Sequence, residues 1–236
     1  MSALRLSSLF MLAYTHLLFD ADGTLYDFHA TEKIALKQLF DHYKIASSEE
    51  NIALYHKGNS QCWKLYEEGS LSMDELKTLR VKLFFDELGL KDDPKEAGEL
   101  FITYLSEHGI LIDGALEVLE KLSKCYTLIM ITNGIAKVQR GRLLSSDTEK
   151  YYKDIIISEE IGVQKPNKEY MTKTLERIKA DKDKCLIIGD SLTSDIQGGI
   201  NSGIDTLYLH LNKEADGEKV WKYDASSYKE LLSLLL

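Results

Sequence analysis

Five short runs of apolar residues recur along the chain, each bounded by polar residues or turn signals. The runs occupy residues 15–20, 126–132, 154–158, 185–190 and 205–209. Their apolar positions are continuous rather than alternating, which is typical of strands buried on both faces. From residue 114 onward, helical patterns separate the runs, at residues 115–124, 168–180, 195–203 and 226–236. This alternation predicts an α/β fold: a three-layer, Rossmann-like core in which helices cover both faces of a parallel sheet.

Residues 29–111 show a different pattern. Four segments have apolar positions at helical spacing and none resembles a strand; they cover residues 31–45, 48–69, 72–89 and 95–109. We therefore expect an all-helical cap domain, inserted between the first strand and the rest of the sheet. The predicted division is a core of residues 11–28 and 112–236, a helical cap of residues 29–111, and an N-terminal extension of residues 1–10 with Met11 as an alternative start.

Composition narrows the class of protein. With 236 residues and 44% hydrophobic content, the chain can bury one core plus a smaller domain. A net charge of −9, with both signs interspersed, argues against a nucleic-acid polymer or an anionic membrane as partner. The three cysteines form no Cys-x-x-Cys pair, so a reducing cytoplasm fits best. The apolar stretch at residues 9–14 is far shorter than the roughly 20 residues that span a membrane.

Polar residues end or directly follow three of the predicted strands. Asp20 and Asp22 come after the first strand, Thr132 and Asn133 at the end of the second, and Asp190 after the fourth. The carboxyl ends of parallel strands meet at one edge of the sheet, which is where open α/β sheets bind ligands. We therefore expect these side chains to lie together.

Lys165 lies in the loop between the third strand and its helix, and is expected at the same edge. Carboxylates gathered there repel one another, each pair by about 4 kcal/mol at a separation of about 4 Å and an effective dielectric of about 20. A cation must offset them, and an all-oxygen donor set is what Mg²⁺ prefers. Mg²⁺, an ammonium group and hydroxyl or amide donors together suit a phosphoryl group.

The candidate nucleophiles are carboxylates rather than Ser-His or Cys-His pairs. Asp20 ends its strand and would be held rigidly for in-line attack on phosphorus. Asp22, two residues on, would give a proton to the leaving oxygen and later take one from the hydrolytic water.

Four motifs, "DADGT", "ITNG", "QKPN" and "GDSLTSD", resemble in order and context those of the haloacid dehalogenase (HAD) superfamily, in its phosphatase branch. The resemblance covers the chain from about residue 12 to 236. It implies that Asp20 forms an aspartyl-phosphate, that Asp22 is the general acid and base, and that Thr132 and Lys165 bind phosphoryl oxygens, with Asn133 beside the substrate. The implied Mg²⁺ site consists of Asp20, Asp22 through its backbone carbonyl, Asp190 and Asp195.

A narrower resemblance links "ITNGIAKVQRGRL", "ISEEIGVQKPNK" and "GDSLTSDIQGGINSGIDT" to phosphatases of pyrimidine and non-standard nucleoside 5′-monophosphates, although "LLSSDTEKYY" departs from that pattern. It implies a small phosphorylated metabolite, a nucleoside monophosphate, as the partner. Asn59, Trp63 and Tyr66 share one face of a predicted helix and would offer a nucleobase a stacking surface and an amide. Packing against neighbouring helices is the alternative role for these three residues.

Other functions stay open at this point. A sugar-phosphate phosphatase or a phosphomutase of the same superfamily is one alternative, and a non-enzymatic phospho-acceptor or binding protein is another. Asp22 argues against dehalogenation, which needs no proton for the leaving group. Asp195 could instead cap its helix. Lys165 is predicted to lie in a loop outside the core, so replacing it with methionine is expected to spare stability.

Overall fold

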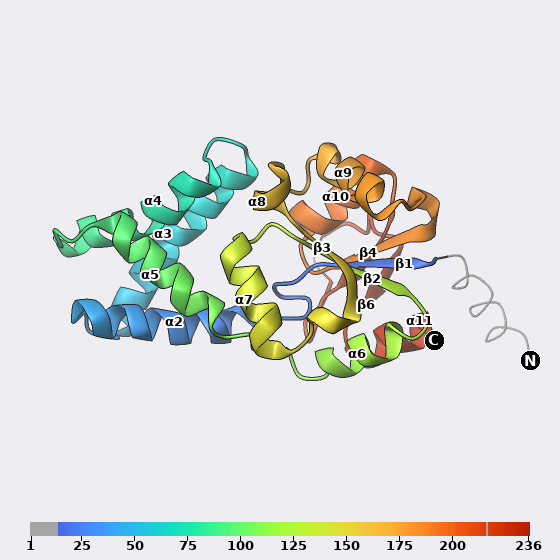
Figure 1. Cartoon of the computed structure of the whole chain (residues 1–236), viewed down its shortest axis with the longest axis horizontal. Coiled ribbons are helices and arrows are strands. Elements are labelled where there is room, and N and C mark those ends of the chain that lie inside the picture. The colour runs from blue at the N-terminus through green and yellow to red at the C-terminus, as the bar shows by residue number, and fades with distance from the viewer. Residues whose placement is uncertain (1–13, 216) are drawn as a thin grey trace, which may run out of the picture. The chain divides into compact units, whose positions relative to one another are not determined.

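A parallel sheet forms the centre of one of the two compact units of the chain (Figure 1). The computed structural model describes residues 14–215 and 217–236; the expected extension at residues 1–10 lies outside them. Six strands pair in the order β3-β2-β1-β4-β5-β6. Their bounds are β1 (His16–Phe19), β2 (Thr127–Thr132), β3 (Tyr152–Ile157), β4 (Cys185–Gly189), β5 (Asp205–Leu209) and β6 (Tyr223–Ala225). The predicted Rossmann-like α/β fold is confirmed.

The sheet is buried on both faces, as the continuous apolar runs predict. Leu17, Leu18 and Phe19 of β1 are fully buried, and β1 lies between β2 and β4. Helices α9 (Lys168–Ile178) and α10 (Gln197–Ser202) cover one face, and α6 (Ala115–Leu122) and α11 (Tyr228–Leu235) cover the other (Figure 1). Strand β6 is not among the predicted strands, because three residues with one buried side chain leave no apolar run in the sequence.

The second compact unit is helical and comprises residues 28–110 and 135–146. Its helices are α2 (Phe28–Tyr43), α3 (Glu49–Glu67), α4 (Met73–Leu88), α5 (Pro94–Ser106) and α7 (Ala136–Ser146). Aromatic side chains fill its interior, with the Phe40 and Phe84 rings stacked at 5.2 Å and Tyr55 edge-on to Phe101 at 5.4 Å. Buried Ile135 and Val138 belong to the same cluster. Residues 135–146, placed with the sheet in the sequence analysis, thus pack with the helical unit.

Short segments complete the chain: η1 (Glu149–Tyr151), α8 (Ser158–Ile161), η2 (Lys182–Lys184) and η3 (Leu192–Ile196), of which η3 is one π-helical turn. Among the helices of residues 14–215 and 217–236, none combines the length and apolar character needed to cross a membrane.

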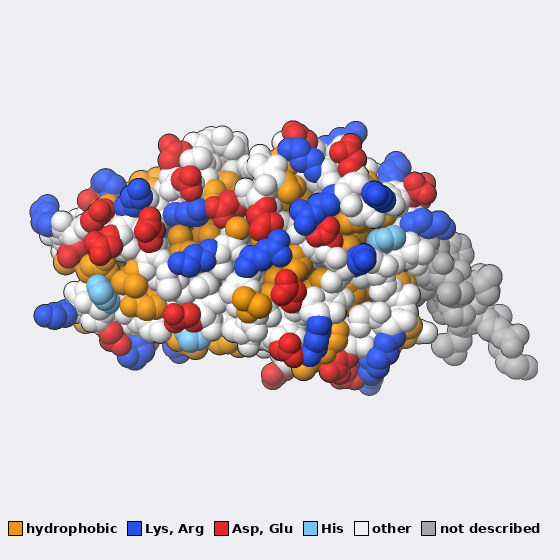
Figure 2. Space-filling view, viewed as in Figure 1, with side chains coloured by type: hydrophobic (Ala, Val, Ile, Leu, Met, Phe, Trp, Pro, Cys, Tyr) orange, Lys and Arg blue, Asp and Glu red, His pale blue; other side chains and the backbone are white. Residues whose placement is uncertain are grey.

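Acidic and basic side chains are interspersed on the face shown in Figure 2, so the charge is not gathered into one area there.

Candidate active site

Three aspartates meet at the carboxyl edge of the sheet. Asp20 follows β1, Asp190 follows β4, and Asp195 lies on η3. Each offers a carboxylate oxygen, and these oxygens all lie within 4.8 Å of one another. The parallel register of β1 and β4 brings the strand ends level, with Phe19 opposite Ile188, and the Asp20 amide donates to the Ile188 carbonyl at 2.9 Å. Asp20 and Asp190 therefore meet as their strand ends predict, whereas the third carboxylate is that of Asp195, which the family resemblance implied, and not that of Asp22.

Lys165 lies at the centre of this group. Its side chain is 1% exposed, and its Nζ donates to Asp20 Oδ1 at 2.7 Å, to Asp195 Oδ1 at 2.6 Å and to the Ile131 carbonyl at 3.0 Å. Three acceptors use all three donors of an ammonium group. Lys165 therefore bridges two carboxylates and fixes the orientation of Asp20. The structure does not support the expectation that this lysine lies outside the core.

Positive charge is in deficit at the site. Burial, and then the charge of Asp195, raises the pKa of Asp20 well above its usual range, with Lys165 only partly opposing the shift. The same two causes raise the pKa of Asp190 to about 6. Burial lowers the pKa of Lys165, but the carboxylates of Asp195 and Asp20 outweigh it, so the net shift is upward and the ammonium stays charged. One lysine supplies a single positive charge beside three carboxylates, so a further cation would reduce the repulsion among them.

Asp195 has a structural role as well. One oxygen accepts from Lys165, and Oδ2 accepts from the Ser191 amide at 3.1 Å. Ser191 in turn caps η3, its hydroxyl accepting from the Ser194 amide at 3.2 Å. Asp195 does not cap the helix that follows it, because the N-cap position of α10 is Ile196 and carries no side-chain hydrogen bond; the capping alternative for Asp195 is therefore wrong.

The loop after β1 is shaped around Asp190. Gly23 has φ +82, and a Cβ at this position would come within 2.4 Å of Asp190 Oδ2, so only glycine fits. Thr24 is fully buried and its hydroxyl donates to Asp190 Oδ1 at 3.0 Å. The sequence analysis assigned roles to neither residue, although both belong to the "DADGT" motif that it singled out.

The other strand-end residues are placed as follows. The Asp22 side chain is half-buried and contributes no oxygen to the three-carboxylate group. Thr132 is buried, and its hydroxyl accepts from the Gly134 amide at 3.1 Å. Asn133 clamps the backbone of Lys165: its Oδ1 accepts from the Lys165 amide and its Nδ2 donates to the Lys165 carbonyl, both at 2.8 Å. Roles of these residues toward a substrate stay predictions.

The three candidate residues on α3 are packed inside the helical unit. Asn59 is 6% exposed and donates to Glu32 Oε1 at 3.3 Å. Tyr66 is buried in the aromatic cluster, and the half-buried Trp63 packs against that cluster and meets the Tyr66 ring edge-on at 5.8 Å. Trp63 keeps the most exposed surface of the three. Contact with a nucleobase stays a prediction.

The donor set of the site fits magnesium. It is built from carboxylate oxygens without histidine or cysteine, and hard oxygen ligands are those that Mg²⁺ takes in proteins. Asp20 and Asp190 are the members best placed to hold it, since Asp195 is occupied by Lys165 and by the Ser191 amide. The negative charge of Asp195 adds to burial in raising the pKa of Asp20 and of Asp190, and a cation beside these carboxylates would oppose both shifts.

Comparison with known proteins agrees with this architecture. The family of haloacid dehalogenase-like hydrolases matches residues 14–203. The chain is 37% identical to the pyrimidine 5′-nucleotidase PynA of Streptococcus pneumoniae, with 94% of this chain and 95% of PynA covered. It is 31% identical to the pyrimidine 5′-nucleotidase YjjG of Escherichia coli, with 92% and 96% covered.

A solved structure is similar over nearly the whole chain. The magnesium-bound crystal structure of the HAD-hydrolase YfnB from Bacillus subtilis superposes with a TM-score of 0.87 at 35% identity, covering 94% of this chain and 98% of YfnB. The resemblance drawn from the four motifs is thus confirmed. With its strand-end aspartates, its central lysine and a family match over most of its length, the chain belongs to the haloacid dehalogenase-like hydrolases.

Proposed function

We propose that this hydrolase is a Mg²⁺-dependent phosphatase that cleaves nucleoside 5′-monophosphates through an aspartyl-phosphate on Asp20. The observation that carries the proposal is the placement of Asp20, which is held by Lys165 at 2.7 Å and stands beside Asp190 and Asp195. A rigid carboxylate at a strand end, with a cation site beside it, is suited to attack on phosphorus.

The proposed reaction has two steps. An oxygen of Asp20 forms a bond to phosphorus while the bond to the ester oxygen breaks, and the carboxylic acid of Asp22 gives its proton to the leaving alkoxide. Water then attacks the phosphoryl group on Asp20 as the Asp22 carboxylate takes a proton, which releases inorganic phosphate and restores both aspartates. Mg²⁺, when bound at Asp20 and Asp190, supplies charge neutralisation between the phosphate and the carboxylates. Lys165 keeps Asp20 oriented throughout.

The substrate class rests on the relatives. PynA and YjjG are pyrimidine 5′-nucleotidases and are similar to this chain over more than nine-tenths of its length. The helical unit of this chain carries the half-buried Trp63, whose ring is one candidate for stacking on a base. Pyrimidine nucleoside monophosphates are therefore the substrates that we propose first.

A panel of phosphate esters tests the proposal. Phosphate release is measured with UMP, CMP, dUMP, AMP, glucose 6-phosphate and p-nitrophenyl phosphate, each with Mg²⁺ and with excess EDTA. We expect the highest kcat/KM for a pyrimidine nucleotide and no turnover with EDTA. A preference for the hexose phosphate would move the assignment to sugar phosphates, and full activity in EDTA would exclude the proposed site.

Asp20→Asn is the matched variant, because the amide has the same shape as the carboxylate but is not nucleophilic. We expect turnover to be lost on every ester while the circular-dichroism spectrum stays that of the wild type. The wild type should incorporate ³²P from labelled substrate into an acid-stable, alkali-labile adduct. Near-wild-type turnover by Asp20→Asn contradicts the covalent mechanism.

A further inference from the structure

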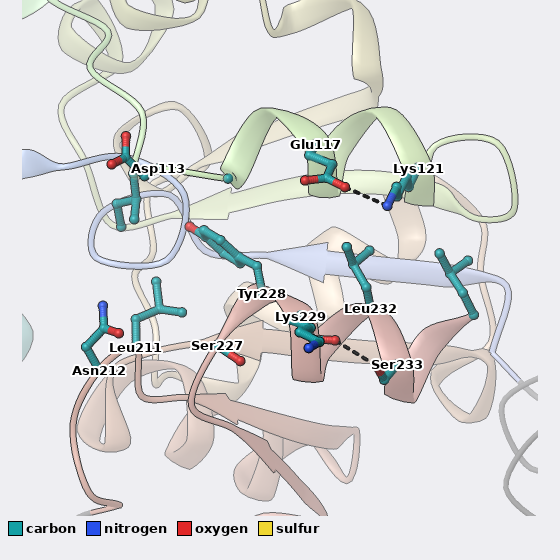
Figure 3. A pocket seen from close by; sticks show the side chains of 13 residues that line it. Asp113, Glu117, Lys121, Leu211, Asn212, Ser227, Tyr228, Lys229, Leu232 and Ser233 are labelled. Carbon is teal, nitrogen blue, oxygen red and sulfur yellow. Dashed lines mark hydrogen bonds and ion pairs between the residues drawn. The ribbon is translucent and has the colours of Figure 1, made fainter. Parts of the chain in front are cut away.

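A tyrosine of the last helix reaches the loop that carries Asp20 and Asp22. Tyr228 is the first residue of α11, and its hydroxyl donates to the Thr24 carbonyl at 2.7 Å in a buried hydrogen bond. Figure 3 shows the ring rising from α11, with its hydroxyl end directed toward the loop. The two residues are 204 positions apart in the sequence. This contact therefore joins the C-terminal helix to the edge of the candidate active site.

Thr24 connects Tyr228 to Asp190 through a second hydrogen bond. The Thr24 backbone carbonyl is held by Tyr228, and the Thr24 hydroxyl donates to Asp190 Oδ1 at 3.0 Å. Thr24 is fully buried, so neither group can turn to water for a replacement partner. Two hydrogen bonds in series thus connect α11 to one of the three carboxylates.

The loop is fixed from more than one side, which limits how it can adjust. The Ile112 amide donates to the Leu25 carbonyl at 3.0 Å, and the amides of Leu25 and Tyr26 both donate to the Ala21 carbonyl at 2.9 Å. The Leu25 amide and the Thr24 carbonyl belong to one peptide group, which is thus held by Ala21 on its N–H side and by Tyr228 on its C=O side. A change there reaches Asp190 through the threonine side chain.

The surroundings of Tyr228 allow its hydroxyl to be removed without loss of packing. One edge of the ring lies over Gly114, where a Cβ would come within 3.1 Å of Cδ2. The ring also borders a pocket of about 650 Å³ between α6 and α11, whose wall includes Leu211 and Leu232 (Figure 3). A phenylalanine can occupy the same position and would lack only the bond to Thr24.

We infer that Tyr228 is a positioning residue for Asp190, and that it tunes the affinity of the site for Mg²⁺. The inference rests on the proposed function only in taking Asp190 as a ligand of that ion. The Tyr228 hydroxyl bonds to Thr24 and not to any of the three clustered carboxylates. It acts by setting the position of Thr24, whose hydroxyl holds Oδ1 of Asp190, one of the three clustered carboxylates.

The test compares Tyr228→Phe with Tyr126→Phe. Tyr126 donates from its hydroxyl to the Leu235 carbonyl at 2.7 Å, at the opposite end of the same helix, so it is matched in chemistry, distance and helix. It has no link to Asp190 in the described part of the chain. Mg²⁺ binding is measured by calorimetry on the full chain, without substrate, and kcat and KM are measured at saturating Mg²⁺.

We expect Tyr228→Phe to raise the Kd for Mg²⁺ about threefold to tenfold, in line with the loss of one buried hydrogen bond. Tyr126→Phe should change it less than about twofold, although it also removes a hydrogen bond to α11. KM for the ester should stay near the wild-type value in both. An unchanged Kd in Tyr228→Phe, or an equal rise in both variants, overturns the inference.

Variants of Thr24 separate positioning from general loosening. Thr24→Val removes the hydroxyl and should weaken Mg²⁺ binding, whereas Thr24→Ser keeps it and should bind as the wild type does. In the double variant Thr24→Val with Tyr228→Phe, the effects should not add, because both act through one link. Additive effects contradict the proposed chain of contacts.

The outcomes also distinguish this inference from the proposed function. A wild type that binds Mg²⁺ but hydrolyses no phosphate ester overturns the proposed function, while the order of Mg²⁺ affinities still tests Tyr228. A wild type that hydrolyses esters with Mg²⁺ and a Tyr228→Phe variant of unchanged affinity overturn the inference alone. A wild type without saturable Mg²⁺ binding overturns both.

Discussion

Lys165 shows how one buried side chain can serve both stability and chemistry. It offsets two carboxylates that are themselves largely shielded from water, since the side chain of Asp195 is 1% exposed and that of Asp20 is 11% exposed. Breaking a buried ion pair by removing one partner leaves an uncompensated charge, which is among the most costly changes in a protein interior. The lysine is therefore expected to stabilise the fold, in addition to orienting Asp20.

Lys165→Met should lower the free energy of unfolding by about 3–5 kcal/mol, because Asp20 and Asp195 lose their counter-charge. Lys173→Met is the matched control. Lys173 also contacts a carboxylate, that of Glu169 at 3.0 Å, and a backbone carbonyl, that of Ile161 at 3.0 Å, but its side chain is 41% exposed. Its loss should cost less than about 1 kcal/mol. Urea unfolding measures both; equal costs contradict the structural role of Lys165.

Trp63→Ala tests the substrate prediction at the same scale. If the ring stacks on a base, kcat/KM for the best nucleotide should fall at least about tenfold, in line with roughly 1–3 kcal/mol for a stacked base. The rate with p-nitrophenyl phosphate should stay unchanged. Leu54→Ala, which also trims a half-buried side chain of α3 packed on the same cluster, controls for lost packing. A similar loss on both esters assigns Trp63 to packing alone.

At the scale of elements, the close approach of α7 to α5 decides which unit α7 joins. A Cβ on Gly141 of α7 would come within 2.4 Å of the Ser106 carbonyl oxygen, so the two backbones touch at this point. Lys137 adds a hydrogen bond to Thr103 at 2.7 Å. The Arg142 guanidinium lies 5.6 Å from the centre of the Phe28 ring, which adds a cation–π contact.

Gly141→Ala should therefore destabilise the helical unit by about 1–3 kcal/mol, as overpacking does in tight interfaces. Gly58→Ala on α3 is its counterpart. A Cβ there would meet Leu83 Cβ at 3.4 Å, Leu83 Cδ1 at 3.7 Å and the Arg80 carbonyl oxygen at 3.8 Å, which are ordinary van der Waals contacts. The better helix propensity of alanine should therefore stabilise the unit by about 0.5–1 kcal/mol. Thermal unfolding followed by circular dichroism gives both values. The same sign for both substitutions contradicts this account of the contact.

The sequence predicts elements best where packing and local pattern agree. Continuous apolar runs predict the five buried strands. The positions of Asp20 and Asp190 follow from the rule that ligands bind at the carboxyl ends of such strands. The bridging of Asp20 and Asp195 by Lys165 could not be predicted, since it depends on side-chain distances across three separate segments. The sequence also does not predict which unit α7 belongs to, because the backbone contact at Gly141 involves no apolar side chain.

At the scale of the whole molecule, one ion is expected to change stability. Mg²⁺ bound at the proposed site would relieve repulsion among the carboxylates of the folded sheet unit only, so the gain in the free energy of unfolding should grow with Mg²⁺ concentration. At about 100 times Kd the gain is about 2.7 kcal/mol, which corresponds to an increase of about 5–10 °C in Tm for a chain of this size. Calorimetric scans should show this increase with MgCl₂ and not with NaCl of equal ionic strength. Asp190→Ala should abolish it; an equal increase in that variant would place the ion elsewhere.

The position of α7 also has a consequence during synthesis on the ribosome. The helical unit is complete only when residues 135–146 have emerged, which is after β2. Strand β1 lacks one of its two neighbouring strands for longer still, because β4 follows about 170 positions later in the chain. At about 5–20 residues per second, β1 spends roughly 8–34 s without that partner. Of the described strands, β1 is therefore the one whose apolar side chains are expected to stay unpaired longest during synthesis.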